Sequence, residues 1–128
     1  MARFSIVVTT YTEPIEWVHQ FPNTTVQTEL MYTYIYDNYT KLTDYTIFLQ
    51  GTISPPILYK VHQYVNHLNL DVGFECIEQN LAGTSFIVAK QNILNRSRTF
   101  YHSMVELYQY ETYPTILEHF HKIIFDHD

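Results

Sequence analysis

Glycine, cysteine and basic residues are all scarce in this 128-residue sequence. It contains 3 glycines, 1 cysteine and 7 lysines and arginines, against 13 aspartates and glutamates, and its formal net charge is -6. A sequence this poor in glycine lacks the glycine-rich loops that cradle phosphates in P-loop and dinucleotide-binding proteins. Nucleic-acid backbones are bound by basic stripes, and only Arg96 and Arg98 stand close together here. We therefore expect no nucleic acid as a partner.

Long hydrophobic runs are also missing. No apolar run approaches the roughly 18 residues that cross a bilayer, and the run over residues 4–8 is too short for a signal peptide. We therefore expect an intracellular, cytoplasmic protein without a membrane span. The single cysteine cannot form an internal disulfide, and it stands in a strand-like stretch between Glu75 and Ile77. We predict that Cys76 is a small buried side chain.

Strand patterns and helix patterns alternate along the chain. Apolar, β-branched runs predict strands buried on both faces, and apolar residues recurring at spacings of three and four predict amphipathic helices. The predicted strands cover residues 6–10, 44–50, 74–77 and 84–89. The predicted helices cover residues 28–42, 55–68, 100–108 and 114–124, with a short one near residues 14–18. Glu29 is expected in the first turn of the helix over residues 28–42.

This alternation predicts one α/β domain over residues 1–128. We expect a small Rossmann-like domain of three layers, in which helices cover both faces of a mainly parallel sheet. The length suits a single hydrophobic core. In open sheets of this kind ligands bind outside the carboxyl ends of the strands. That rule places the rim of a pocket at residues 10–13 and 50–52.

Two segments have the Glu-x-x-His spacing, which places a carboxylate and an imidazole on one helix face. They start at Glu16 and Glu118. Di-metal sites use two such motifs with further glutamates on long helices in bundle order, whereas strands intervene here. We therefore assign no metal ligands to them. His102 and Glu106 are one helical turn apart and are interpreted as a surface ion pair.

Tyrosine is frequent, with 12 residues in the chain. Four tyrosines stand on one predicted helix, at positions 32, 34, 36 and 39. We interpret most of them as packing residues whose hydroxyls reach water. Since tyrosine is enriched at interfaces, an aromatic surface that binds a protein partner or stacks on a sugar is the open alternative.

Five segments follow one another in the order of a known family. They are VVTTYTEPIEW at residues 7–17, YIYDNY at 34–39, TIFLQG at 46–51, AGTSFIVA at 82–89 and LEHFHKIIF at 117–125. In these segments the chain resembles the family catalogued as domain of unknown function 3431. The resemblance spans nearly the whole sequence.

Members of that family are similar to glycosyl transferases that use nucleotide-sugars. The resemblance implies a reduced glycosyl-transferase-A-like domain, a nucleotide-sugar ligand and, in an active enzyme, a divalent metal such as manganese. Matched position by position, it makes Glu13 and Glu29 the candidate catalytic residues, as general base or metal ligand. The candidate substrate-binding residues that it implies are Thr10, Tyr11, Gln50, Gly51 and Glu118.

The chain departs from the family between Trp17 and Glu29. The family carries a further strand and a Gly-Arg-Glu motif there, whereas this chain has Gln27-Thr28 before the glutamate. We therefore expect a shortened nucleotide-binding half. Two hypotheses stay open. One is a glycosyl-transferase-like domain, either active or reduced and inactive. The other is a non-enzymatic structural or interaction protein, for example in the virion of a large DNA virus, that joins a protein partner or its own copies through a tyrosine-rich surface.

Overall fold

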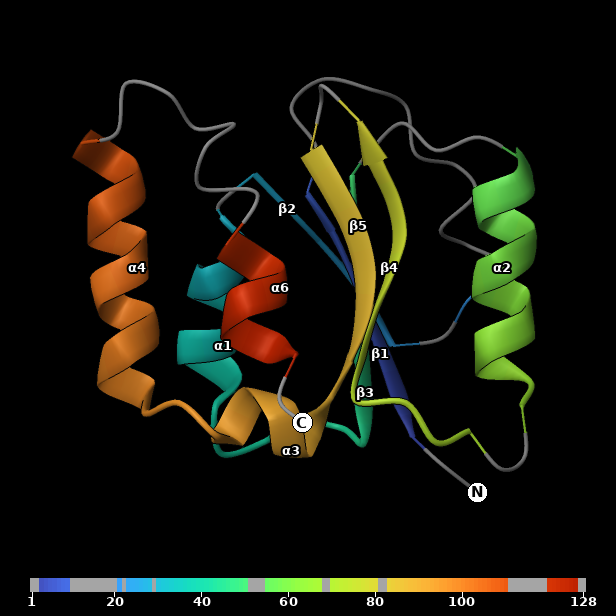
Figure 1. The fold of residues 1–128 in the computed structure, drawn as a ribbon, viewed down its shortest axis with the longest axis horizontal. Helices are drawn as coiled ribbons and strands as arrows, with labels where there is room; N and C mark the ends of the chain where they lie inside the picture. The colour runs from blue at the N-terminus through green and yellow to red at the C-terminus, as the bar shows by residue number, and fades with distance from the viewer. Residues whose placement is uncertain are drawn as a thin grey trace.

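Five strands form one mixed sheet with helices on both of its faces (Figure 1). The computed structural model describes residues 3–9, 21, 23–28, 30–50, 55–67, 70–80, 83–110 and 120–126. The strands are β1 (Phe4–Thr9), β2 (Thr24–Gln27), β3 (Tyr45–Gln50), β4 (Phe74–Asn80) and β5 (Gly83–Ala89). The helices are α1 (Met31–Asn38), α2 (Pro55–Val65), α3 (Lys90–Leu94), α4 (Arg98–Tyr110) and α6 (Phe120–Phe125).

The strand order is β2-β1-β3-β5-β4. β1 pairs in parallel with β2 and with β3, while β5 pairs antiparallel with β3 and with β4. The predicted α/β sheet is therefore confirmed, but it is mainly parallel only at the β2-β1-β3 end. The reason lies between Asn80 and Gly83, because a connection this short allows a hairpin, whereas a parallel pair needs a crossover of about a dozen residues.

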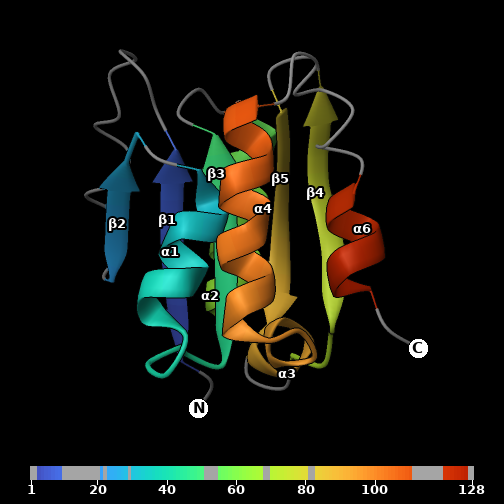
Figure 2. The same ribbon diagram turned by 90° about the vertical axis from the view of Figure 1, so that its left-hand side faces the viewer.

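Two hydrophobic layers bury both faces of the central strands. Val7 and Phe48 pack into the layer that contains α1, α4 and α6. Ile6, Val8 and Ile47 pack into the layer that contains α2. Figure 2 shows α1, α4 and α6 in front of the sheet, with α2 behind it. Since neighbouring residues of β1 point to opposite buried layers, its sequence reads as a continuous apolar run.

The three tyrosines of α1, and Tyr39 directly after it, belong mainly to the helical layer. Tyr32 is fully buried, and Tyr34, Tyr36 and Tyr39 are half-buried. The hydroxyl of Tyr39 donates a hydrogen bond to the Arg96 carbonyl at 2.6 Å, and that of Tyr101 on α4 donates one to the Ile93 carbonyl at 2.6 Å. These hydroxyls therefore bond to backbone carbonyls that the helices bring close, and not only to water as the sequence suggests.

Strand β2 lies where the sequence analysis expects no strand. Its four residues, Thr-Thr-Val-Gln, occupy an edge of the sheet, and the two central side chains are exposed. An edge strand needs little apolar pattern because one face and one side can contact water.

Helix α1 begins at Met31, so Glu29 precedes the helix and is not in its first turn. The short α3 was also not predicted.

Cys76 is exposed, and the prediction that it is buried is wrong. It lies on β4, one of the two edge strands, just before a register shift in the pairing with β5. Its partner in the register, Phe86, is fully buried because β5 has a strand on each side and both layers over it. Position in the sheet, and not local composition, therefore decides the exposure of this thiol.

Among the described helices, none has the length and apolar character needed to cross a membrane. The predicted helix near residues 14–18 and the first part of the one over 114–124 lie outside the described residues.

Candidate functional site

The order of strands reverses at β1. The chain adds β2 on one side of β1 and then returns to add β3 on the other side, and all three strands are parallel. In the register, Thr9 is paired with Gln27 and with Gln50, so the three strands end level with one another. Ligands of open α/β sheets bind outside the carboxyl ends of strands at such a reversal. The sheet therefore has the topology of a ligand site at this edge.

Most predicted site residues follow these three strand ends in the chain but lie outside the described residues. Gln50 is described in its backbone only, as the last residue of β3. Residues 10, 11, 13, 29, 51 and 118, that is Thr10, Tyr11, Glu13, Glu29, Gly51 and Glu118, are outside the described part of the chain. Glu29 comes two residues after Gln27 in the sequence, and Gln27 is the last residue of the unpredicted strand β2, paired with Thr9.

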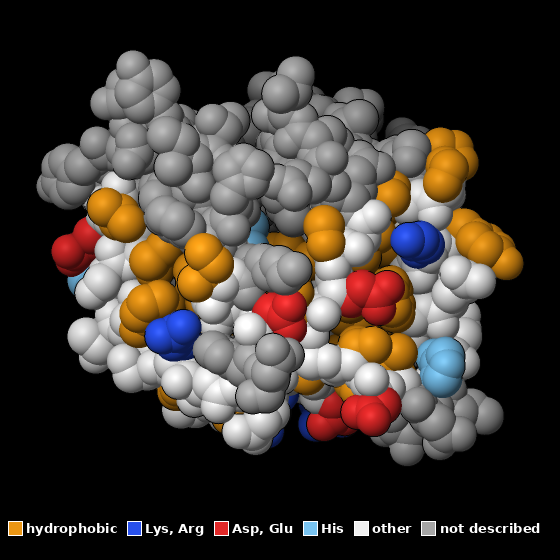
Figure 3. Space-filling view, viewed as in Figure 1, with side chains coloured by type: hydrophobic (Ala, Val, Ile, Leu, Met, Phe, Trp, Pro, Cys, Tyr) orange, Lys and Arg blue, Asp and Glu red, His pale blue; other side chains and the backbone are white. Residues whose placement is uncertain are grey.

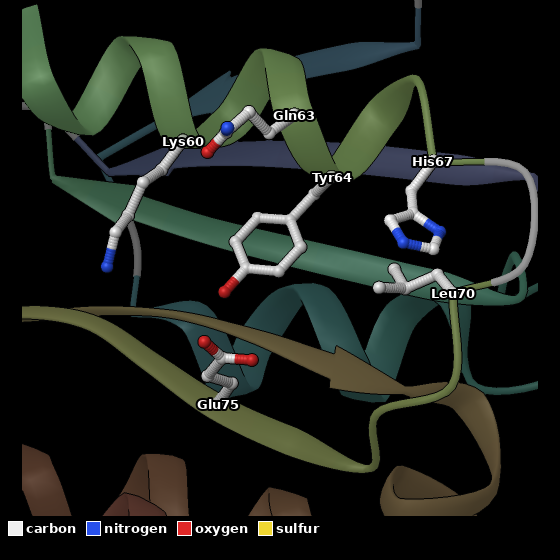
Figure 4. Close-up of a pocket in the computed structure, with 6 residues that line it drawn as sticks. All are labelled: Lys60, Gln63, Tyr64, His67, Leu70 and Glu75. Atoms are coloured by element: carbon white, nitrogen blue, oxygen red, sulfur yellow. The ribbon is translucent and has the colours of Figure 1, made fainter.

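A groove lies between α2 and β4 (Figure 4). It has a volume of about 300 Å³ and is lined by Lys60, Gln63, Tyr64, His67, Leu70 and Glu75. The four lining residues from α2 and its end recur at spacings of three and four, which places them on one side of the helix. Four of the six lining side chains carry an amide, an imidazole or a charge, so the groove offers hydrogen-bonding groups beside a somewhat larger apolar surface.

Tyr64 and Glu75 connect the two walls of the groove. The Tyr64 side chain points from α2 toward the Glu75 carboxylate on β4. Burial, and then the interaction with the Glu75 carboxylate, raise the pKa of the Tyr64 phenol. The phenol therefore stays protonated at neutral pH and can act as a donor.

Opposite charges line the groove without pairing with each other. Lys60 and Glu75 are both exposed, and the one ion pair within the described residues joins His102 to Glu106 instead.

The sequence does not predict this groove because Tyr64 is interpreted as an apolar position of the second long helix. The available signal was the polar series at positions 60, 63 and 67, which shares one helix side with Tyr64.

A second hollow, of about 390 Å³, lies at the other end of β3, beside Asp44, Lys90 and Gln91. The Asp44 carboxylate accepts a hydrogen bond from the Arg3 backbone N–H at 2.7 Å, and the Asp44 carbonyl accepts one from the Lys90 N–H at 2.8 Å. These bonds tie the start of α3 and the residue before β1 to β3. The residues here serve the connection between elements.

The second Glu-x-x-His motif ends in the core. His121 is 2% exposed, and its Nδ1 atom lies 2.7 Å from the Tyr32 hydroxyl oxygen. Within the described residues, no three histidine, cysteine, aspartate or glutamate side chains are grouped so that they could hold a metal ion. The predicted ion pair of His102 with Glu106 is confirmed at 3.3 Å, with both side chains at least half exposed.

Comparison with known proteins adds no relative. The chain matches no protein-family model, and it has no significant match among curated proteins or solved structures. The resemblance to the domain of unknown function 3431 family therefore stays a prediction.

Proposed function

We propose that the protein is a reduced glycosyl-transferase-like domain that binds a nucleotide-sugar at the carboxyl ends of β1, β2 and β3. The observation that supports this most is the level ending of three parallel strands, in which Thr9 is paired with both Gln27 and Gln50. The strand order reverses at the same place, which is where open α/β sheets bind their ligands.

The chain positions of two carboxylates agree with this proposal. Glu13 follows Thr9 by four residues, and Glu29 follows Gln27 by two. Thr9 and Gln27, the described strand residues that precede the two glutamates in the chain, are paired in the register and end at neighbouring points of one edge. Carboxylate oxygens are the ligands that Mg²⁺-like cations prefer, so this pair suits a divalent metal such as manganese, which would offset the charge of a diphosphate.

A carboxylate in the same place suits a general base. In sugar transfer the base takes the proton of the acceptor hydroxyl while the hydroxyl oxygen bonds to the sugar and the sugar–phosphate bond breaks. The nucleoside diphosphate then leaves with the bonding electron pair. Few basic residues are present to hold a diphosphate, which is the reason that we propose a reduced domain.

Calorimetric titration of the full chain tests the binding. Uridine and guanosine diphosphosugars are added with and without manganese, and the expected result is saturable heat with at least one donor. Glu13→Gln and Glu29→Gln are expected to weaken the manganese-dependent part, whereas Glu106→Gln on α4 serves as the matched control. Absence of heat with every donor would reject the proposal. Release of free sugar or transfer to an acceptor then separates an active domain from an inactive one.

A second candidate function, protein assembly, is favoured by β2. This edge strand carries Val26, which is 42% exposed, and β1 is its strand partner among the described residues. An edge strand with an exposed apolar side chain can accept a strand from another chain. On the face that Figure 3 shows, hydrophobic side chains are visible on both sides and in the middle, with scattered charges between them. Light scattering that shows a strict monomer, unchanged by Val26→Lys, would count against assembly.

A further inference from the structure

The groove between α2 and β4 is separate from the carboxyl edge of the sheet. Glu75 is paired with Ile87, which is paired with Ile47, three residues before Gln50 on β3. At a rise of about 3.3 Å per residue, Glu75 lies about 10 Å before the level of that edge. It also lies two strands away from β3, since β5 stands between them. A ligand in this groove would therefore not occupy the site proposed above.

The charges of the lining restrict the ligand. Lys60 and Glu75 carry opposite formal charges, so together they add no net charge to the groove. An anion attracted by Lys60 is repelled by the Glu75 carboxylate of the same groove, and a cation attracted by Glu75 is repelled by Lys60. Charged ligands of one sign are therefore disfavoured, because like charges at close range cost free energy.

The hydrogen-bonding groups of the lining disfavour a lipid-like ligand. Pockets for such ligands are lined mostly by hydrophobic side chains, whereas among the described lining residues Leu70 is wholly apolar and Tyr64 contributes an aromatic ring. An apolar ligand would displace water from the Gln63 amide and the Glu75 carboxylate without replacing its hydrogen bonds, which is costly. A suitable ligand has both a small apolar face and many hydrogen-bonding groups.

We infer that the groove between α2 and β4 is a binding site for a neutral sugar unit. One face of a sugar ring is made of C–H groups, which can pack on Tyr64 and Leu70. Its hydroxyls both donate and accept, so they can donate to the Glu75 carboxylate and accept from the Lys60 ammonium. The Gln63 amide can do both.

The contact between Tyr64 and Glu75 prepares the groove for such a ligand. A carboxylate has about four lone-pair positions, and the Tyr64 side chain faces it from the other wall of the groove. The positions that Tyr64 does not use stay available to sugar hydroxyls. Because the side chains of Lys60, Gln63 and Glu75 are exposed, much of their interaction with water must be replaced, and the expected dissociation constant is about 1 mM.

Nuclear magnetic resonance titration of the nitrogen-labelled full chain tests this inference. Glucose, galactose, mannose and N-acetylglucosamine are added one at a time to about 50 mM, without nucleotide or metal, to exceed the expected constant. We expect saturable shifts of the backbone amides of α2 and the start of β4 with at least one sugar. Glu75→Gln and Gln63→Ala, both at exposed positions, are expected to raise the dissociation constant about tenfold while the rest of the spectrum is preserved.

The matched control is Tyr59→Ala on the same helix. Tyr59 is 66% exposed and does not line the groove, so its removal is expected to leave sugar binding unchanged. Glycine and inorganic phosphate are titrated in parallel. No shifts with any sugar, or shifts with glycine or phosphate alone, would overturn the inference. Since nucleotide and metal are absent, this outcome is independent of whether the chain binds a nucleotide-sugar at the carboxyl edge.

Discussion

The Nδ1 atom of His121 lies 2.7 Å from the hydroxyl oxygen of Tyr32, although 89 residues separate the two in the sequence. The contact joins α6 to α1 inside the layer that covers one face of the sheet. The His121 ring also packs on Phe86 of β5, with ring centres 5.1 Å apart. One buried imidazole thus contacts two helices and the sheet, so its hydrogen bond is expected to contribute to stability.

Tyr32→Phe is expected to lower the free energy of unfolding by about 1–2 kcal/mol, because it removes a buried hydrogen bond while keeping the ring. Urea denaturation followed by circular dichroism measures the change. Tyr59→Phe is the control, since that side chain is 66% exposed. Equal stabilities of the two variants would show that the contact with His121 contributes nothing.

Gly73→Ala is expected to destabilise the fold by about 1–3 kcal/mol through overpacking. A Cβ atom at this position would lie 2.6 Å from the Asn92 side-chain nitrogen, which donates a hydrogen bond to the Phe125 carbonyl at 2.7 Å. The amide must therefore move away from the end of α6. Urea denaturation of the single variants and the double variant with Asn92→Ala forms a thermodynamic cycle. We expect Gly73→Ala to cost much less once Asn92 is shortened, and additive effects would refute the proposed clash.

Stability is expected to fall at alkaline pH because of Tyr101. Burial, and then the neighbouring Tyr39, raise the pKa of its phenol, against a smaller opposite effect of Arg96. The folded state therefore holds this proton more tightly than the unfolded state, whose tyrosines titrate near pH 10. The stabilisation is complete below about pH 10 and is lost as the pH rises further, by about 1.4 kcal/mol per pH unit for one group.

Urea denaturation between about pH 9 and pH 11 measures this loss, since that range brackets the titration of an unfolded tyrosine. Tyr101→Phe should give a shallower decline, and Tyr59→Phe should keep the original one. A decline that is the same in all three proteins would assign the pH dependence to other groups. Part of the slope is expected to remain in Tyr101→Phe, because the pKa of Tyr64 is also raised.

Cys76 is expected to react with a thiol reagent such as dithionitrobenzoate in the folded protein. Its side chain is exposed on β4, and reaction requires access of the reagent to the thiolate. The absorbance of the released product should correspond to one thiol per chain without denaturant. Reaction only after unfolding would support the buried side chain that the sequence pattern suggests.

The sequence predicts well those elements whose apolar pattern is strong. β1 and β3 are continuous apolar runs, and α2 has apolar residues at helical spacing from Ile57 to Val65, so burial and pattern agree. It fails for β2, whose residues Thr24–Gln27 carry no such pattern because an edge strand is stabilised by backbone hydrogen bonds to β1. It also fails for Cys76, whose exposure depends on which strand is outermost.

The two candidate sites also differ in how far the sequence predicts them. The strand ends at Thr9 and Gln50 can be located from the sequence, since a polar residue or glycine follows each apolar run. The contact of Tyr64 with Glu75 cannot, because α2 and β4 meet only after β5 has turned back against β3 and placed β4 at the edge. No short stretch of the sequence shows that β5 pairs antiparallel with β3 and with β4.

The sequence by itself determined the helices and strands that have a strong apolar pattern, and that the central strands are buried on both faces, because those properties depend on residues close together in the chain. Only the tertiary structure decided the order and direction of the strands, the exposure of Cys76, and the pairing of Tyr32 with His121 and of Tyr64 with Glu75. The physical reason is that these features depend on which surfaces remain uncovered when distant segments pack, and burial and hydrogen bonding are settled by the whole fold.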